Sequence, residues 1–383
     1  MSTFVPHASQ ALRYYREQIF LSVGELAQKT NISANRIEKA EQSDTPVFKL
    51  SQLEKIAKIL FVPVIDLCLD ELNPKKLPTI VDFRNNPDLS LDSYSYQSVI
   101  HEAYQQRENY VLVMQALEEE PTPFTLELTG FDAVADANRI RAYFNIDESI
   151  QEKLTISSAD EYYNSWRKLI ERKDVLVFEK SRVNIKSDGL ALYYAVCPTI
   201  VMFSSGQHYS RRLFTLIHEL VHLGLKQSRL DGSVYSLNQD DEEKYCNHVA
   251  GYVLAPESAL QKYWDSGLPL NEAIKIIRKQ LKISKPAIAM QLYMTNRISQ
   301  TELNRVLNEF EQEYAPKSTG QPRSPSKDSS TLKQYGKVFV QNVISAFWQD
   351  SISLATAQQI LNLNPQKYPL AFKELEARVF SNV

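Results

Sequence analysis

RRLFTLIHELVHLGL, residues 211–225, predicts one amphipathic helix. Its apolar side chains recur at three- and four-residue intervals from Leu213 to Leu223, which is the period of a helix with one buried face. Ser210 can accept a backbone hydrogen bond as the N-cap, and Gly224 can end the helix. The stretch therefore predicts a helix packed against a core.

His218 and His222 lie four residues apart in HELVH, so their imidazoles leave the same face of the helix about one turn apart. Two ring nitrogens in this arrangement can share one cation. Glu219 falls beside them, where its carboxylate can accept a proton from water that a metal activates. The alternative is a core helix with two hydrogen-bonded histidines. That alternative buries three polar side chains without a cation, so the pattern favours a catalytic zinc site.

A catalytic zinc usually has three protein ligands, and NQDDEEKYCNHVAGYVLAP, residues 238–256, is the obvious source of the third. Its periodicity predicts a second helix, and Glu243 is the preferred ligand. Asn247 follows one turn later on the same face, where its amide can orient a ligand or the backbone of the first helix. Glu242 and Asp241 are less well phased, and the acids can also be read as a solvated helix start.

Two further histidines, His208 and His248, are candidates for stabilising the transition state, with exposed surface histidines as the alternative. Cys68, Cys197 and Cys246 form no CxxC pair, so the sequence indicates neither a disulfide framework nor a thiolate zinc site. Any metal is therefore expected to have nitrogen and oxygen ligands.

Residues 211–225, together with EKYCNHVAGYVLAP at 243–256 and VDFR at 81–84, resemble the ImmA/IrrE metallopeptidases. The resemblance covers about residues 78–300 and implies a minimal gluzincin-like zinc peptidase domain with a small β-sheet. The family usually has glycine where this chain has Val221, and we expect only a small packing change from it. The resemblance implies these roles: His218, His222 and Glu243 as Zn²⁺ ligands and Glu219 as general base.

Three stretches have the alternating or apolar pattern of strands: TPFTLELTG at 122–130, DVLVFEK at 174–180 and GLALYYAVCPTIVMFS at 189–204. By the same resemblance, CPTIVMF at 197–203 would be the edge strand on which an extended peptide lies. Cys197 is either a buried structural cysteine, which is favoured, or an inhibitory thiolate that reaches the metal.

Residues 12–61 resemble helix-turn-helix domains of the phage-repressor (XRE) type, through LRYYREQ, SVGELAQKTNIS, NRIEKAEQ and LSQLEKIAKIL. Ser22 and Ser33 are expected N-caps, and Asn31 is expected to leave its helix in a left-handed conformation. The recognition helix would offer these side chains to double-stranded DNA: Ser33, Asn35, Arg36 and Lys39. The expected helices are Leu12–Ile19, Val23–Thr30, Ser33–Ala40, Leu50–Leu60 and Val62–Leu69.

The charge of the chain does not favour nucleic-acid binding as a whole, because the net charge of the 383 residues is −3. Residues 1–73 also carry nearly equal numbers of basic and acidic side chains. A DNA-binding domain of this kind is expected to bind weakly unless it is dimeric, so a homodimer is possible. A helical domain used for protein contacts is the alternative.

The composition, with 43% hydrophobic and 23% charged residues, is that of a globular protein, and the length predicts two or three domains. No apolar run reaches the roughly 20 residues that span a bilayer, and residues 1–18 lack a secretion signal, so we expect a cytoplasmic protein without membrane contact.

The predicted fold class is multidomain and mainly α, with an α+β core. The expected segments are a helix-turn-helix domain at 1–73, the peptidase domain at 78–265, a helical extension at 266–314, a flexible linker at 315–334 and a C-terminal helical module at 335–383. The linker is expected because its serines and prolines bury too little apolar surface.

The leading functional hypothesis is a zinc endopeptidase that acts as a regulatory switch and cleaves a partner protein such as a repressor or antitoxin, under stress or phage-related signals. The second is a DNA-binding transcriptional regulator whose peptidase-like domain senses a signal without proteolysis. A third is the toxin component of a toxin–antitoxin system.

Overall fold

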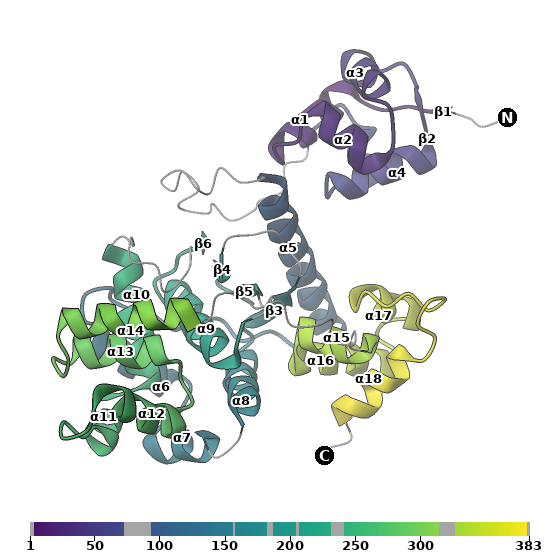
Figure 1. The fold of residues 1–383 in the computed structure, drawn as a ribbon. Helices are drawn as coiled ribbons and strands as arrows, with labels where there is room; N and C mark the ends of the chain where they lie inside the picture. Colours follow the sequence, from purple (N-terminus) through teal and green to yellow (C-terminus); the bar gives the residue numbers. More distant parts are fainter. Residues whose placement is uncertain are drawn as a thin grey trace. The chain divides into compact units, whose positions relative to one another are not determined.

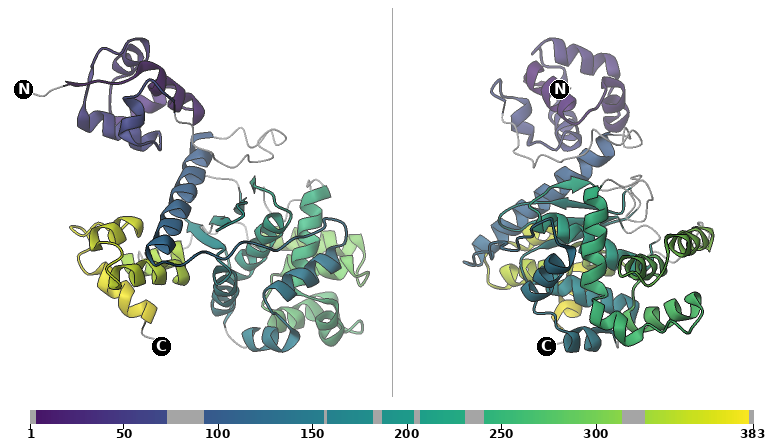
Figure 2. Two further views of the ribbon diagram at one scale, coloured as in Figure 1. Left: turned by 180° about the vertical axis from the view of Figure 1, so that it is seen from behind. Right: turned by 90° about the vertical axis from the view of Figure 1, so that its left-hand side faces the viewer.

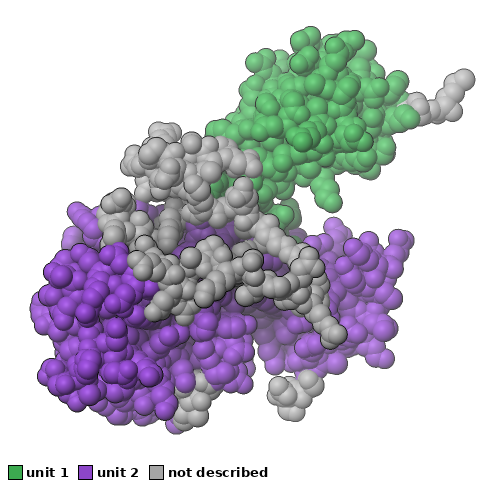
Figure 3. All heavy atoms as spheres, viewed as in Figure 1, with its two compact units in different colours: residues 1–77, 85–106 green, residues 78–84, 107–383 purple. Residues whose placement is uncertain are grey.

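The computed structural model describes residues 4–72, 93–155, 158–181, 187–203, 207–230, 241–313 and 326–380. These residues are mainly helical, with one two-stranded and one four-stranded sheet (Figure 1). The chain divides into two compact units, residues 1–77 with 85–106 and residues 78–84 with 107–383 (Figure 3). Helix α5 (Ser93–Ala116) begins in the first unit and ends in the second. The predicted boundary near residue 75 and the VDFR motif lie outside the described residues.

The first unit has the helices expected of the N-terminal segment. They are α1 (Ser9–Gln18), α2 (Val23–Thr30), α3 (Ala34–Gln42), α4 (Leu50–Ile59) and the 3-10 helix η1 (Val64–Leu67). Ser22 forms a capping box with Glu25, and Asn31 ends α2 with φ 57°, as predicted. Ser33 is the N-cap of α3, as predicted, although its side chain accepts no capping hydrogen bond.

A small core and one buried ion pair hold these helices together. Ile32 and Ile37 are buried between α2 and α3, and a short antiparallel pair joins β1 (Phe4–Val5) to β2 (Phe48–Lys49). Arg16 on α1 reaches Glu41 on α3 through two bonds of 2.6 and 2.8 Å. A bidentate arginine of this kind fixes the orientation of one helix on another.

The four-stranded sheet of the second unit has the strand order β3-β5-β4-β6. β5 (Thr199–Phe203) pairs in parallel with β3 (Leu176–Lys180) and antiparallel with β4 (Gly189–Leu192). β6 (Arg229–Leu230) pairs with β4 and ends the described sheet on that side. The prediction that 197–203 forms the peptide-binding edge was therefore wrong, because β5 is hydrogen-bonded on both sides.

The predicted strand at 122–130 is an extended segment outside the sheet. Phe124, Leu126 and Leu128 alternate inward and are buried, which explains the strand-like pattern. The segment makes a single isolated bridge, Pro123 to Val196, and its remaining backbone bonds go to a loop and to the end of a helix. An alternating pattern of apolar side chains indicates that one face of a segment is buried. It does not show that the backbone is hydrogen-bonded to a neighbouring strand.

Helices surround the sheet and form one core with it, as the views in Figures 1 and 2 show. α9 (Tyr209–Gly224) contacts β4, β5, α8 (Ala159–Glu171) and α10 (Asp241–Leu254). The other helices of this unit before residue 314 are α6 (Ala133–Tyr143), α7 (Glu148–Thr155), α11 (Glu257–Tyr263), α12 (Leu270–Leu281), α13 (Lys285–Met294) and α14 (Gln300–Glu313). Among the described residues, no helix combines the length and the apolar character needed to cross a membrane.

The C-terminal helices also belong to the second unit. They are α15 (Lys327–Tyr335), α16 (Lys337–Trp348), α17 (Leu354–Ile360) and α18 (Ala371–Phe380). α15 contacts β3 and α16 contacts α8. The predicted linker at 315–334 therefore extends too far, because 327–334 are helical; residues 314–325 lie outside the described part. The physical reason is tertiary: Asp328 on α15 is buried in an ion pair with Arg378 on α18.

A buried polar cluster joins the α15–α16 turn to α8. Arg167 on α8 pairs with Glu171 and Glu179 and donates to the carbonyl of Lys333 at 2.7 Å. Gly336 lies between the two helices with φ 83° and ψ 162°, a conformation open essentially to glycine alone. A Cβ there would lie 1.9 Å from Glu171 Oε1.

We therefore expect Gly336→Ala to lower the free energy of unfolding by roughly 2–5 kcal/mol, because backbone strain and overpacking add. Urea unfolding followed by tryptophan fluorescence measures it, since all three tryptophans (Trp166, Trp264 and Trp348) lie in the second unit. Gly267→Ala, at an exposed loop position, is the control and should be nearly neutral. Equal stability of the two variants would contradict the packing described for Gly336.

Candidate metal centre

α9 carries the HELVH residues in the interior of the second unit. Every residue from Arg212 to Gly224 is buried, so the helix is enclosed on all sides and not on one face as the periodicity predicted. It begins at Tyr209, with His208 as the N-cap that accepts from the backbone of Ser210. The prediction of Ser210 as N-cap was therefore wrong by two residues, because the imidazole of His208 accepts the capping hydrogen bond.

The second helix brings one carboxylate to the two histidines. His218 Nε2 and His222 Nε2 lie 3.2 Å apart. Glu243 on α10 places Oε2 3.2 Å from His218 Nε2, and Oε1 3.6 Å from His222 Nε2. Both histidines are fully buried and Glu243 is 8% exposed. The three predicted ligand residues therefore converge in one buried cluster.

The spacing of these atoms fits a tetrahedral metal. Zinc bound to nitrogen and oxygen at about 2.0–2.2 Å places its ligand atoms roughly 3.3–3.6 Å from one another. The distance between the two ring nitrogens and that from His218 Nε2 to Glu243 Oε2 are both 3.2 Å, close to this range, and the other carboxylate oxygen, Oε1, lies 3.6 Å from His222 Nε2. Two imidazole nitrogens and one carboxylate oxygen are also a donor set that zinc uses in catalytic sites. The residues present therefore fit a zinc ion with one open position.

Glu219 lies against the first residue of β4. Its side chain is fully buried, and an ideal Cβ on Gly189 would come within 2.1 Å of Glu219 Oε1. Only glycine leaves room for the carboxylate at this point of the strand. Sequence reasoning missed Gly189, because a glycine at the start of a strand is not distinctive without the helix that packs on it.

Two other neighbours of the ligands were also missed. Arg229 on β6 places Nε 2.7 Å from Glu243 Oε1 and Nη1 2.8 Å from Glu242 Oε2. Gln227 Oε1 lies 3.2 Å from His222 Nδ1, an arrangement suited to orienting the ring. Neither residue belongs to a recognisable motif, so the sequence carried no signal for them.

The other predicted site residues are Asn247, His248 and His208. Asn247 is buried one turn after Glu243 on α10, and its orienting role stays a prediction. His248 is half-buried, and burial, reinforced by Lys244, lowers its pKa. His208 caps the start of α9, roughly 15 Å along the helix axis from His218. The structure gives His208 a capping role and does not bring it to the histidine pair.

Cys197 and Cys246 are both buried. Burial raises the pKa of Cys197 to about 12, so its thiol stays protonated near neutral pH. Among the described residues, the metal cluster does not include Cys197, which agrees with the structural role favoured for it. Cys246 instead lies close to the site, with Sγ 3.7 Å from His222 Nδ1.

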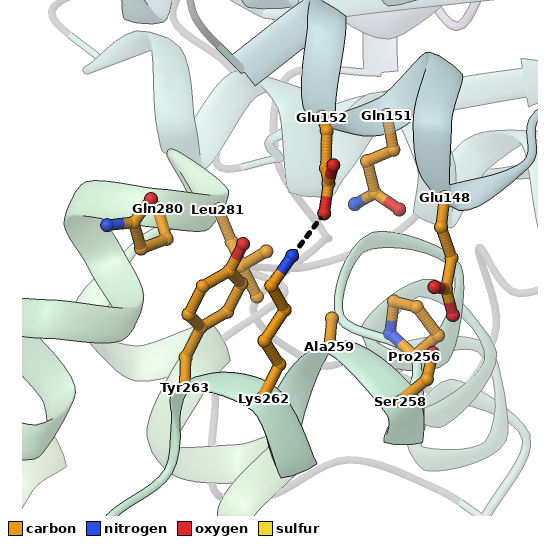
Figure 4. A pocket seen from close by; sticks show the side chains of 10 residues that line it. All are labelled: Glu148, Gln151, Glu152, Pro256, Ser258, Ala259, Lys262, Tyr263, Gln280 and Leu281. Carbon is orange, nitrogen blue, oxygen red and sulfur yellow. Dashed lines mark hydrogen bonds and ion pairs between the residues drawn. The ribbon is translucent and has the colours of Figure 1, made fainter.

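A separate pocket lies between α7, α11 and α12 (Figure 4). Glu152 and Lys262 form an ion pair of 2.5 Å across it, and Glu148 and Tyr263 contribute to its lining. None of the three cluster residues lines this pocket. It is therefore distinct from the candidate metal centre.

The contact between Gly189 and Glu219 predicts a specific energetic coupling. Gly189→Ala should lower the free energy of unfolding by about 1–3 kcal/mol, because the new methyl group overlaps the carboxylate. Most of this loss should disappear in a Glu219→Ala background, where the overlapping atoms are gone. A double-mutant cycle in urea measures the coupling, and additive effects of the two substitutions would contradict the contact.

The comparison with known proteins supports the same region. No curated protein and no solved structure matches the chain significantly. Residues 170–293 match the Peptidase_M78 family model, described as the IrrE N-terminal-like domain. The matched segment contains β3 to β6, α9 and α10, and with them all four residues of the predicted site. Residues 170–293 are thus similar to the IrrE N-terminal-like domain family.

Proposed function

We propose that this protein is a zinc-dependent endopeptidase. The observation that carries the proposal is the buried cluster of His218, His222 and Glu243, with Glu219 beside it on the same helix. A bound zinc ion would supply Lewis-acid activation of water and of the scissile carbonyl. Glu219 is the general base, because it is the carboxylate on α9 next to both histidines and its position is fixed by Gly189.

An extended peptide fits the sheet on the side of β4 and β6. The other edge strand, β3, contacts α15, whereas β4 carries Gly189 beside the general base. Because β4 is itself paired with β5 and β6, the peptide backbone would pair with β6, the edge strand next to β4, without needing a specific side chain. We therefore propose an unfolded or extended segment of a partner protein as substrate, with a repressor or antitoxin as the leading class.

The test compares wild type with Glu219→Gln. The amide keeps the size of the side chain but cannot accept a proton, so cleavage of the partner should fall by at least about a hundredfold, the low end for a general base. Zinc content, measured by mass spectrometry, should stay at the wild-type level. Glu127→Gln, at an exposed position, is the matched control and should keep full activity.

Unchanged cleavage by Glu219→Gln would refute the enzymatic proposal. If the partner is not cleaved by wild type but the cellular response persists, the protein is a regulator that senses a signal without proteolysis. His218→Ala and Glu243→Ala should both lose zinc. If Glu243→Ala retains zinc, Glu243 is not the third ligand, and Glu242 takes its place in the proposal. A neighbouring antitoxin gene, with toxicity on overexpression, would instead support a toxin component.

The second proposed activity is double-stranded DNA binding by the first unit. Ser33, Asn35, Arg36 and Lys39 are all exposed on or just before α3, the helix that follows the tight turn after α2. Exposed polar and basic side chains at the start of such a helix are suited to base edges and phosphates. This would couple proteolysis to transcription regulation.

Arg36→Ala and Lys39→Ala should each weaken operator binding, by about 1–3 kcal/mol for a base contact and less for a phosphate contact. Fluorescence anisotropy over a series of salt concentrations separates the two, since loss of a phosphate contact lowers the salt slope by about one. Lys55→Ala, an exposed residue on α4, removes the same charge elsewhere. An equal loss in all three variants would exclude recognition by α3.

A further inference from the structure

Arg229 is the cation that contacts the third ligand residue. Its Nε lies 2.7 Å from Glu243 Oε1, while the other carboxylate oxygen, Oε2, lies 3.2 Å from His218 Nε2. Oε1 also lies 3.6 Å from His222 Nε2, so Arg229 contacts the carboxylate oxygen next to His222, while Oε2 is next to His218. Arg229 itself is only 4% exposed, so its guanidinium is not a surface group that happens to be close.

The register of the sheet explains why Arg229 reaches the site. Arg229 is opposite Ala191 in the β4–β6 pair, and opposite residues of an antiparallel pair share one face. Ala191 is two residues after Gly189, so both lie on the face that packs against Glu219. Strand β6 thus delivers Arg229 to the side of the sheet where α9 lies.

The same guanidinium also contacts Glu242, with Nη1 2.8 Å from Oε2. Glu242 and Glu243 are consecutive residues in the first turn of α10. The side chain of Glu242 is 39% exposed and that of Glu243 is 11% exposed. One arginine therefore contacts both carboxylates, of which the more buried one, Glu243, belongs to the cluster.

We propose that Arg229 is a positioning residue that selects Glu243 over Glu242 as the third metal ligand. This inference rests on the metal centre proposed above. A carboxylate held by a second partner keeps one orientation, so less conformational entropy is lost when the metal binds. A guanidinium suits this task because its planar fork reaches two carboxylates at once, which an ammonium group does not do.

The test measures zinc affinity, by competition with a chromophoric chelator, in wild type, Arg229→Ala, Arg229→Lys and Glu242→Gln. Loss of a group that orients a ligand typically weakens metal binding about 10–100-fold, and we expect this for Arg229→Ala. Arg229→Lys keeps the charge but reaches one carboxylate, so its affinity should fall at least about threefold. Glu242→Gln keeps the ion pair between Arg229 and Glu243, so its zinc affinity should stay within about threefold of that of wild type.

Wild-type affinity in Arg229→Ala would overturn the proposal. If that variant does not fold, judged by its urea midpoint, Arg229→Lys decides the question, and wild-type affinity there has the same meaning. Visible spectra of the Co²⁺-loaded proteins add a readout that general destabilisation does not move: a changed spectrum in Arg229→Lys indicates a changed ligand set, as expected. Glu242→Gln losing metal as strongly as Arg229→Ala would make Glu242 a ligand and refute the selection.

The assay uses no peptide, so it is independent of catalysis. A wild-type protein that binds no zinc would refute the metal centre itself. A wild-type protein that binds zinc but cleaves nothing would leave the role of Arg229 intact while refuting the peptidase proposal.

Discussion

The approach of α10 to α9 is the constraint on which the candidate site depends. The two histidines come from one helix and are positioned by helical geometry alone. The third ligand comes from a helix that starts 19 residues after the second histidine, and its carboxylate must end within 3.6 Å of both rings. Packing of the two helices in the shared core, where Cys246 and Val249 of α10 are fully buried, sets this distance.

Two buried arginines of the second unit are each paired with two carboxylates. A charged side chain in the interior is costly unless an opposite charge and hydrogen bonds accompany it. Arg229 satisfies this condition with Glu243 and Glu242, and Arg167 with Glu171 and Glu179. The first set of ion pairs lies at the candidate metal centre, whereas the second holds the C-terminal helices on α8. The need to pair buried charges thus accounts for contacts at the candidate site and for contacts that hold the C-terminal helices.

The order of the strands determines which strands lie at the edges of the described sheet, where the proposed peptide would pair. β5 and β4 each pair with strands on both sides, and α15 contacts β3, so β6 is the edge strand of the described sheet on the side of β4, the strand that packs against Glu219. Gly189 contributes in two ways, since its lack of a side chain admits Glu219 and brings the strand backbone close to it. Gly189 therefore links the position of β4 to the position of the Glu219 side chain.

The sequence by itself determined the local features of this protein. The spacing of His218 and His222, the phase of Glu243 and the turn at Asn31 all follow from interactions within a few residues, and the helices formed there as predicted. Tertiary structure alone decided which strand is central, why Asp328 lies in a helix, and which arginine meets Glu243. These depend on partners far apart in the chain, and a single sequence carries no record of such pairings. For the same reason His208, a plausible site residue by type, proved to be the cap of α9.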